Sequence, residues 1–167
     1  MPYAVQRLGF SAFEVGATLG IYGVGMVVGA VVAARITRAL PFGAVIAPGP
    51  IAGLAAAVVM VLTIWTPSVV LAGLSFFLMG VGPIIWVIST ATLRQTITPR
   101  ALLGRVSTIN ITAYSARPVG AAIGAFVGGV YGAETCLVVA AFAFFIQAVV
   151  ILTSPVPRLA RQPQLVG

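Results

Sequence analysis

Three polar side chains recur on one face of an apolar stretch in the second half of the sequence. Asn110, Tyr114 and Arg117 follow the i, i+4, i+7 spacing of a helix face. The chain has no acid at membrane depth, so Arg117 would pair with a backbone carbonyl, an anionic substrate group or an acid on a missing segment. Arg117 lies about 18 Å past Arg105 along a helix, near mid-bilayer, where an arginine costs about 2.5–3.5 kcal/mol on insertion scales. We expect Arg117 to face a cavity or a partner; if the helix begins later, its side chain would extend to the membrane interface instead.

A weaker polar face runs through an earlier apolar stretch. Ser75, Met79, Gly82, Trp86 and Thr90 share one side of a predicted helix. A surface of serine, methionine and tryptophan suits amphipathic ligands, so Trp86, Ser75 and Thr90 are candidates for lining a binding cavity. The alternative is ordinary packing against a neighbouring helix.

The composition restricts the class of protein that carries these residues. Of the 167 residues, 60% are hydrophobic and 7% are charged, whereas soluble domains carry about 25% charged residues. The mean hydropathy of +1.16 indicates a membrane-embedded chain. The nine arginines are scattered between apolar runs and do not gather on one face, so the basic charge does not indicate a nucleic-acid partner.

Reactive residue types are scarce in the sequence. The chain has no histidine and no aspartate, a single cysteine, Cys136, and two acids, Glu14 and Glu134. Metal sites built from His and Cys, and catalytic sites of the Ser–His–Asp kind, therefore lack their residue types. Both glutamates fall at expected helix ends with no partner residue type nearby. We expect no enzyme activity, no metal and no cofactor.

Five stretches are long enough to cross a bilayer core of about 30 Å, which predicts an all-α integral membrane protein. The turn Trp65-Thr-Pro-Ser68 divides the long uncharged stretch between Arg38 and Arg94 into two helices. The amino-terminal residues lack the pattern of a secretory signal, and residues 155–167 are expected to form a flexible tail. The predicted transmembrane helices, which make up one domain (1–154), are 15–34, 43–64, 69–93, 106–131 and 135–154.

The positions of the arginines predict the orientation in the membrane. With five crossings, seven arginines fall on the side of the carboxyl terminus, and Arg7 and both glutamates fall on the other. By the positive-inside rule the carboxyl terminus is cytoplasmic and the amino terminus lies outside. The sequence thus predicts a multi-pass protein of the cell membrane, with the lipid bilayer as a partner. The candidates for gating on the cytoplasmic side are Arg35, Arg38, Arg94, Arg100, Gly104 and Arg105.

The first predicted helix carries small residues on two sides. Small residues let helix backbones approach closely in lipid, so we expect helix neighbours on both sides. The fifth predicted helix is apolar all round and is expected to face lipid. The two stripes of the first helix are Gly16, Gly20 and Gly23 and, roughly opposite, Gly25, Gly29 and Ala33.

Three segments of the chain resemble a known family of transporters. They read Leu-Gly-Phe-Ser-Ala-Phe-Glu-Val-Gly (8–16), Arg-Gln-Thr-Ile-Thr-Pro-Arg-Ala-Leu-Leu-Gly-Arg-Val-Ser (94–107) and Arg-Pro-Val-Gly-Ala-Ala-Ile-Gly-Ala (117–125). Together with the glycine-rich first helix, they resemble the carboxyl-terminal half of the major facilitator superfamily, in its enterobactin-exporter-like multidrug efflux branch. The resemblance covers essentially the whole chain and is specific for the superfamily, not for a substrate.

The resemblance implies a partial major-facilitator fold. The five predicted helices would correspond to helices eight to twelve of twelve, so the carboxyl-terminal half would lack its first helix. Helices eight, ten and eleven of the family border the central cavity, which would place Arg117, Asn110 and Tyr114 there. Many relatives carry an acidic residue in the loop after helix eight, where Gly29–Arg35 has none. Charge-relay gating through that loop is therefore not carried over to this chain.

The sequence leaves more than one function open. The first is part of a secondary active transporter, in a bacterial membrane, that exports amphipathic small molecules by ion-coupled alternating access. The chain has no Walker A segment, so ATP is not the expected direct energy source. The small-molecule substrate and the missing amino-terminal half would be its partners. The alternative is a non-transporting truncated membrane protein, or a subunit that assembles with a separately encoded partner. A third hypothesis is that the chain is a complete channel or regulator of five helices.

Overall fold

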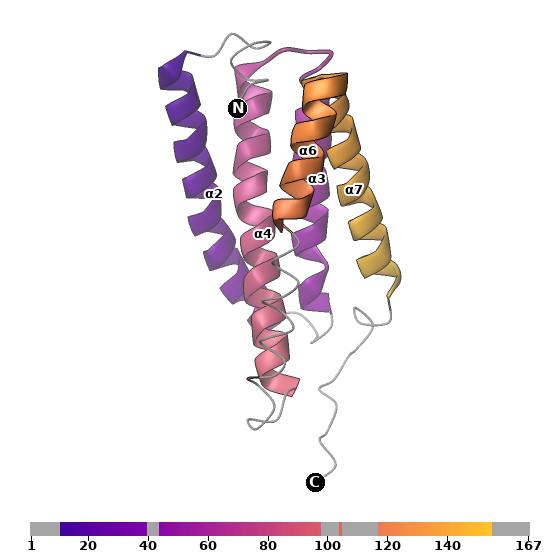
Figure 1. Ribbon diagram of the computed structural model, residues 1–167. Helices are drawn as coiled ribbons and strands as arrows, with labels where there is room; N and C mark the ends of the chain where they lie inside the picture. Colours follow the sequence, from indigo (N-terminus) through magenta and orange to yellow (C-terminus); the bar gives the residue numbers. More distant parts are fainter. Residues whose placement is uncertain (1–10, 40–43, 98–103, 105–116, 155–167) are drawn as a thin grey trace.

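The computed structural model describes residues 11–39, 44–97, 104 and 117–154. Across these residues the elements are all helical, which confirms the predicted fold class at that level (Figure 1). Four described stretches are long and apolar enough to cross a membrane, and α6 is a shorter apolar helix, so the chain is a multi-pass membrane protein. The elements are α2 (Ala12–Ala39), the short 3-10 helix η1 (Ala44–Ile46), α3 (Pro48–Leu62), α4 (Val69–Ile97), α6 (Arg117–Tyr131) and α7 (Ala133–Thr153).

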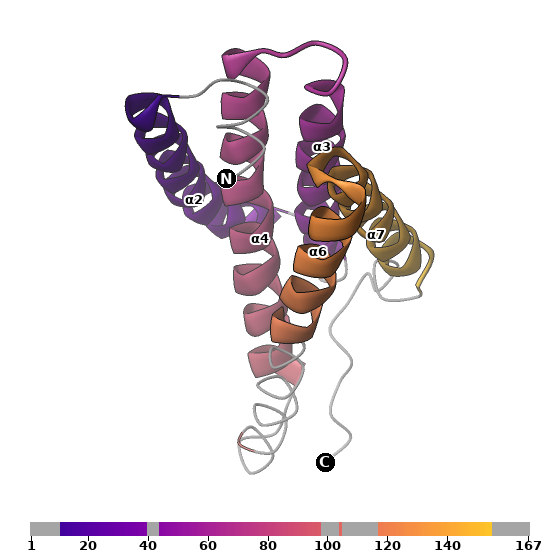
Figure 2. The same ribbon diagram turned by 45° about the horizontal axis from the view of Figure 1, so that its top comes forward.

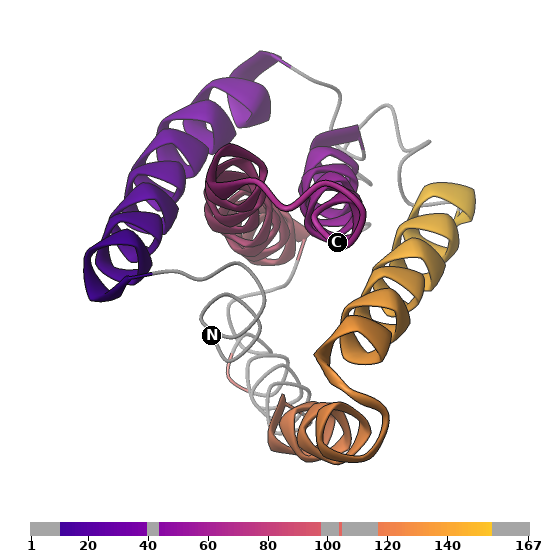
Figure 3. The same ribbon diagram turned by 90° about the horizontal axis from the view of Figure 1, so that it is seen from above.

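The helices alternate in direction through the bundle. The start of α2, the α3–α4 turn and the α6–α7 turn lie at one end, and the last turns of α2, α4 and α7 lie toward the other (Figure 1). Contacts between helices run in the order α2, α4, α3, α7, α6. In Figures 2 and 3 the described helices follow this order as an arc, with α2 and α6 at its two ends. The central helix of the packed part is α4.

The first helix, α2, is longer than the predicted range 15–34. Ser11 and Glu14 form a capping box, in which the Glu14 N–H donates to Ser11 Oγ (3.3 Å) and the Ser11 N–H donates to Glu14 Oε2 (2.7 Å). This box starts the helix before the uncharged run begins. At its other end the helix continues through Arg35 and Arg38, beyond the predicted end at residue 34. Arginine is a good helix former and is favourable near a helix carboxyl terminus.

The other helices depart from their predicted bounds for local reasons. α3 begins at Pro48, later than the predicted start at residue 43, because a proline fits the first position of a helix, where no N–H bond is needed. α4 continues past residue 93 and contains Pro83. A single residue, Gly132, joins α6 to α7, and its φ of 86° is a conformation that favours glycine. The predicted helix 106–131 is described from Arg117 onward, and its earlier residues lie outside the described part.

The capping box makes the start of α2 sensitive to pH. The pKa of Glu14 lies below its ordinary value of 4.5, because the backbone N–H and then the hydroxyl of Ser11 donate to the carboxylate. A carboxylate with a lowered pKa stabilises the folded helix above the ordinary pKa, and this contribution is lost as the pH falls through the lowered value. Below a pH of about 4.5 we therefore expect the first turn of α2 to open more often.

Hydrogen exchange followed by mass spectrometry measures this opening, once the rates are corrected for the intrinsic pH dependence of exchange. The Glu14→Gln variant removes the titrating group and keeps the side chain's size, so its corrected protection should not change with pH in this range. An equal pH dependence in the variant and the wild-type protein would show that another group is responsible.

Candidate functional site

The central helix α4 is held between α2 and α3 by glycine contacts on two of its sides. A Cβ added at Gly80 would overlap the Tyr22 carbonyl oxygen of α2, and one added at Gly25 would overlap the Phe77 carbonyl oxygen of α4. On another side, a Cβ at Gly82 would lie 2.8 Å from the backbone nitrogen of Gly53 in α3. Only glycine permits backbones to approach this closely. These contacts hold the backbone of α4 close to those of α2 and α3.

The predicted polar face of α4 lies largely against α3. Ser75 is 2% exposed, and its hydroxyl donates to the Ala56 carbonyl oxygen of α3 at 2.8 Å. A Cβ at Gly49 of α3 would lie 2.8 Å from Trp86 Cβ. Along Ser75, Gly82 and Trp86, the face therefore has the packing role that the sequence analysis gives as the alternative to a cavity.

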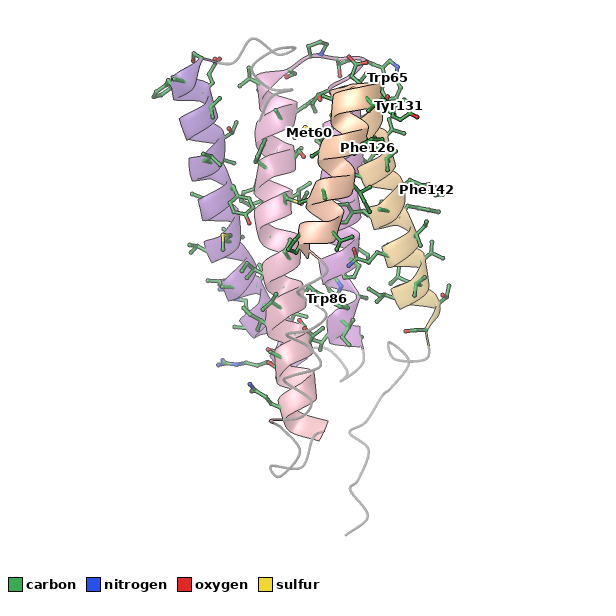
Figure 4. The ribbon with its side chains drawn as sticks, in the orientation of Figure 1. Met60, Trp65, Trp86, Phe126, Tyr131 and Phe142 are labelled. Carbon is green, nitrogen blue, oxygen red and sulfur yellow. The ribbon has the colours of Figure 1, made fainter. Side chains whose placement is uncertain are left out.

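Trp86 and Thr90 remain half-buried at the edge of this contact. The Thr90 hydroxyl donates to the Trp86 carbonyl oxygen at 2.7 Å, so its hydrogen is used within α4. Figure 4 shows Trp86 toward the end of the bundle where α4 finishes, whereas Trp65 and Tyr131 lie at the opposite end. Trp65 and Tyr131 are 70% and 66% exposed, which suits aromatic side chains at a membrane interface.

The polar face predicted for the fourth crossing is described only in part. Asn110 and Tyr114 lie outside the described residues, and Arg117 is described as the first residue of α6, without its side chain. Farther along the same face, a Cβ at Gly124 or at Gly128 would meet Cys136 of α7 at 3.9 or 3.8 Å. The Cys136 thiol also donates to the Gly124 carbonyl oxygen at 3.5 Å. This half of the face thus packs on α7.

The basic residues that the sequence analysis names for gating are also described in part. Arg35 and Arg38 are exposed in the last turns of α2. The backbone of Arg94 belongs to the last turns of α4, and Gly104 is exposed. Arg100 and Arg105 lie outside the described residues. The two acids occupy the first turns of α2 and α7, at the end of the bundle opposite to Arg35 and Arg38 (Figure 1).

The described helices present few kinds of polar group between their two ends. Between the end with the acids and the end with the arginines, the described side chains offer hydroxyls, one thiol, thioethers, the amide of Gln147, aromatic rings and a large excess of aliphatic groups. Among these residues there is no group of three His, Cys, Asp or Glu side chains that could hold a metal ion. Such a surface can bind an amphipathic molecule or a lipid chain.

Ser89 is the least satisfied polar group of the described core and is not among the candidate residues predicted from the sequence. It is 1% exposed, and its Oγ has no hydrogen-bond partner within the described residues. Viewed down the axis of α4, Ser89 points in a direction between those of Ser75 and Ile85. Ile85 is also buried, at 3% exposed. Its distance of fourteen residues from Ser75 places the two serines near the same helix face and is the only sequence signal for its burial.

Comparison of the chain with protein-family models, with curated proteins and with solved structures found no match.

Proposed function

We propose that this chain is the carboxyl-terminal part of a secondary active transporter of the major facilitator superfamily, which exports amphipathic small molecules by ion-coupled alternating access. The observation that carries the proposal is the arc that the described helices form, in which neighbours are antiparallel and four of the stretches are of membrane length. The helices at the two ends of the arc, α2 and α6, each have one main helix neighbour among the described residues. An arc of this kind suits a half that rocks against a second half around a site near the bilayer midplane.

The proposed substrate site lies between α4 and α6. Its candidates on α6 and the residues before it are Arg117, Asn110 and Tyr114. The start of α6 lies level with the middle of α4 in Figure 1, which supports a site within the bilayer. An arginine at that depth would attract an anionic substrate group, and the half-buried ring of Trp86 would offer apolar surface. The proposed role of Ser75 is to hold α4 against α3 behind the site, and Thr90 would border it.

The proposed gate lies at the end where α2 and α4 finish. Arg35 and Arg38 are exposed there, Arg94 belongs to the last turns of α4, and Arg100, Gly104 and Arg105 follow α4 in sequence. We propose that this end is cytoplasmic and that the start of α2 faces outside, because arginines are retained on the cytoplasmic side of a membrane.

A second candidate function is that of a subunit that assembles with a separately encoded membrane protein and does not transport by itself. The observation that favours it is the open stripe of α2. A Cβ at Gly16, Gly20 or Gly23 would meet no atom within 4 Å among the described residues, although their spacing suits close helix packing. The predicted second helix neighbour of α2 is therefore absent from the described chain.

One experiment tests both functions. The genomic DNA that adjoins this coding sequence is first translated in all three frames and searched for further transmembrane helices. The chain alone and the chain joined to any such helices are then reconstituted in liposomes under an imposed proton gradient. We expect the chain alone not to accumulate an amphipathic fluorescent dye, because alternating access needs a second half. We expect the joined protein to accumulate it, and Arg117→Ala to reduce the accumulation several-fold.

The Arg161→Ala variant is the matched control, because it removes an arginine from the predicted tail. Dye accumulation by the chain alone would contradict the proposal of a half-transporter. The subunit function would be favoured if the adjoining helices bound the chain but the combined protein transported no dye under any ion gradient.

A further inference from the structure

An exposed apolar stripe on α2 ends in two arginines. Val24, Val27, Val31, Arg35 and Arg38 are spaced by three and four residues, so they follow one side of the helix. The three valines are 58%, 66% and 50% exposed, and both arginines are exposed. The stripe faces away from α4, which packs on the side that contains Gly25 and Gly29. The stripe is therefore an exposed surface that is apolar along the three valines and cationic at the two arginines.

The depth of the stripe in the membrane follows from the length of the uncharged run. The run 15–34, which separates Glu14 from Arg35, spans about 30 Å at ~1.5 Å per residue. This equals the thickness of the hydrocarbon core. With Glu14 near one surface, the two guanidinium groups lie at the level of the lipid headgroups of the opposite leaflet. The valines then lie at the level of the acyl chains of that same leaflet.

The charge of this end of α2 calls for an anionic partner. Both acids of the chain are at the other end of the bundle, in the first turns of α2 and α7, so they cannot neutralise Arg35 and Arg38. The chain as a whole has a formal net charge of +7. Guanidinium groups bind phosphate oxygens by paired, charge-assisted hydrogen bonds. A phosphate with an acyl chain attached matches both parts of the stripe.

We propose that the stripe is a binding surface for an anionic phospholipid, whose phosphate is held between Arg35 and Arg38 and whose acyl chain lies along Val24, Val27 and Val31. The surface selects lipids of the leaflet at the end where α2 finishes. The inference depends on the membrane location of the helices and on the stripe facing lipid. It concerns the half of α2 that contains Arg35 and Arg38, whereas a partner helix on Gly16, Gly20 and Gly23 would contact the half that contains Glu14.

A local fluorescence experiment tests the surface in the full chain. In the background Trp65→Phe/Trp86→Phe, a single reporter is introduced as Val28→Trp, because Val28 is 38% exposed and lies beside the stripe without belonging to it. Quenching by brominated phosphatidylglycerol is compared with quenching by brominated phosphatidylcholine in bilayers. An arginine near an anionic surface changes affinity by about fivefold. We expect phosphatidylglycerol to be favoured at this reporter by about that factor or more.

The controls separate a specific site from general attraction of the basic chain. A second reporter, Ile146→Trp, lies on exposed α7 in the same leaflet and should show a preference near one. The variant Arg35→Gln/Arg38→Gln should bring the ratio at the first reporter near one. The variant Arg158→Gln/Arg161→Gln, which removes the same charge from the predicted tail, should leave it unchanged. High salt should weaken the preference.

Three results would overturn the proposal. They are an equal preference at both reporters, a preference at the first reporter that survives the loss of Arg35 and Arg38, and a preference that inorganic phosphate abolishes at the concentration of the lipid. The last result would assign the arginines to a free anion instead of a lipid. Circular dichroism of each variant establishes that the helices are retained, so a changed ratio reports on the lipid.

Discussion

The variants Gly25→Ala and Gly80→Ala are each expected to lower the free energy of unfolding by about 1–3 kcal/mol, the range for overpacking a close contact. At both positions the added Cβ would overlap backbone atoms of the opposite helix: the Phe77 carbonyl oxygen in one case and the Tyr22 carbonyl oxygen in the other. Backbone atoms cannot change rotamer, so α2 and α4 would have to move apart. Separation would also weaken the dispersion contacts that hold helices together in lipid.

The double variant Gly25→Ala/Gly80→Ala should be less destabilised than the sum of the two single variants. A Cβ at Gly80 would also lie near the backbone of Gly25 and Met26, so both substitutions act on one crossing of the helices. Once one methyl group has separated α2 from α4, the second meets less resistance. Contacting residues commonly show such coupling.

The matched controls are Gly16→Ala and Gly20→Ala, on the open stripe of the same helix. No described atom lies within 4 Å of a Cβ at either position, and alanine favours a helix more than glycine does. These variants should be as stable as the wild-type protein or slightly more stable. Unfolding in a mild detergent, followed by circular dichroism, measures the five variants and the wild-type protein. If the two classes of variant lost equal stability, the packing of α2 on α4 would be wrong.

Two buried serines of α4 are expected to respond to alanine with opposite signs. Ser75 donates to the Ala56 carbonyl oxygen across the α3–α4 contact, and a hydrogen bond between membrane helices contributes about 0.6–1.7 kcal/mol. Ser75→Ala should lower the free energy of unfolding by that amount. Ser89 has no partner among the described residues, and an unsatisfied buried hydroxyl is unfavourable. Ser89→Ala should therefore raise the free energy of unfolding, by up to about 1 kcal/mol.

The comparison is well matched because the two residues share the residue type, the helix and nearly complete burial, at 2% and 1% exposure. The same unfolding experiment measures both variants. A loss of stability in Ser89→Ala as large as that in Ser75→Ala would mean that the Ser89 hydroxyl has a partner outside the described residues. A stable Ser75→Ala variant would show that its hydrogen bond contributes little.

The helical class follows from the sequence because it depends on long uncharged runs, which only helices or barrels can place in lipid. The ends of the helices are set by local hydrogen bonding instead. Ser11 and Glu14 start α2 outside the apolar run, and Pro48 starts α3 inside a run that hydropathy alone treats as continuous. Of the two glycine stripes of α2, spacing identifies both, but only the structure shows that the one containing Gly25 and Gly29 is packed.

The candidate site is harder to predict because a packing face and a cavity face use the same residue types. Ser75, Gly82 and Trp86 are small, polar or aromatic at helical spacing, which fits a ligand surface as well as the contact with α3 that the structure shows. The distance to the neighbouring helix decides whether such a face packs or lines a cavity. That distance cannot be predicted from the sequence of one helix. The face that includes Asn110 and Tyr114 lies outside the described residues and stays a prediction.

The pairing of α2 with α4, and not with its sequence neighbour α3, also bears on how the protein is made. α2 and α3 have few mutual contacts in the described residues, whereas both pack on α4. When only α2 and α3 have been inserted during synthesis, these two helices therefore share no packed interface. They become a stable unit when the third emerges from the ribosome. Synthesis that stops before α4 would release two loose helices to membrane proteases, and synthesis that stops after it would release a three-helix unit.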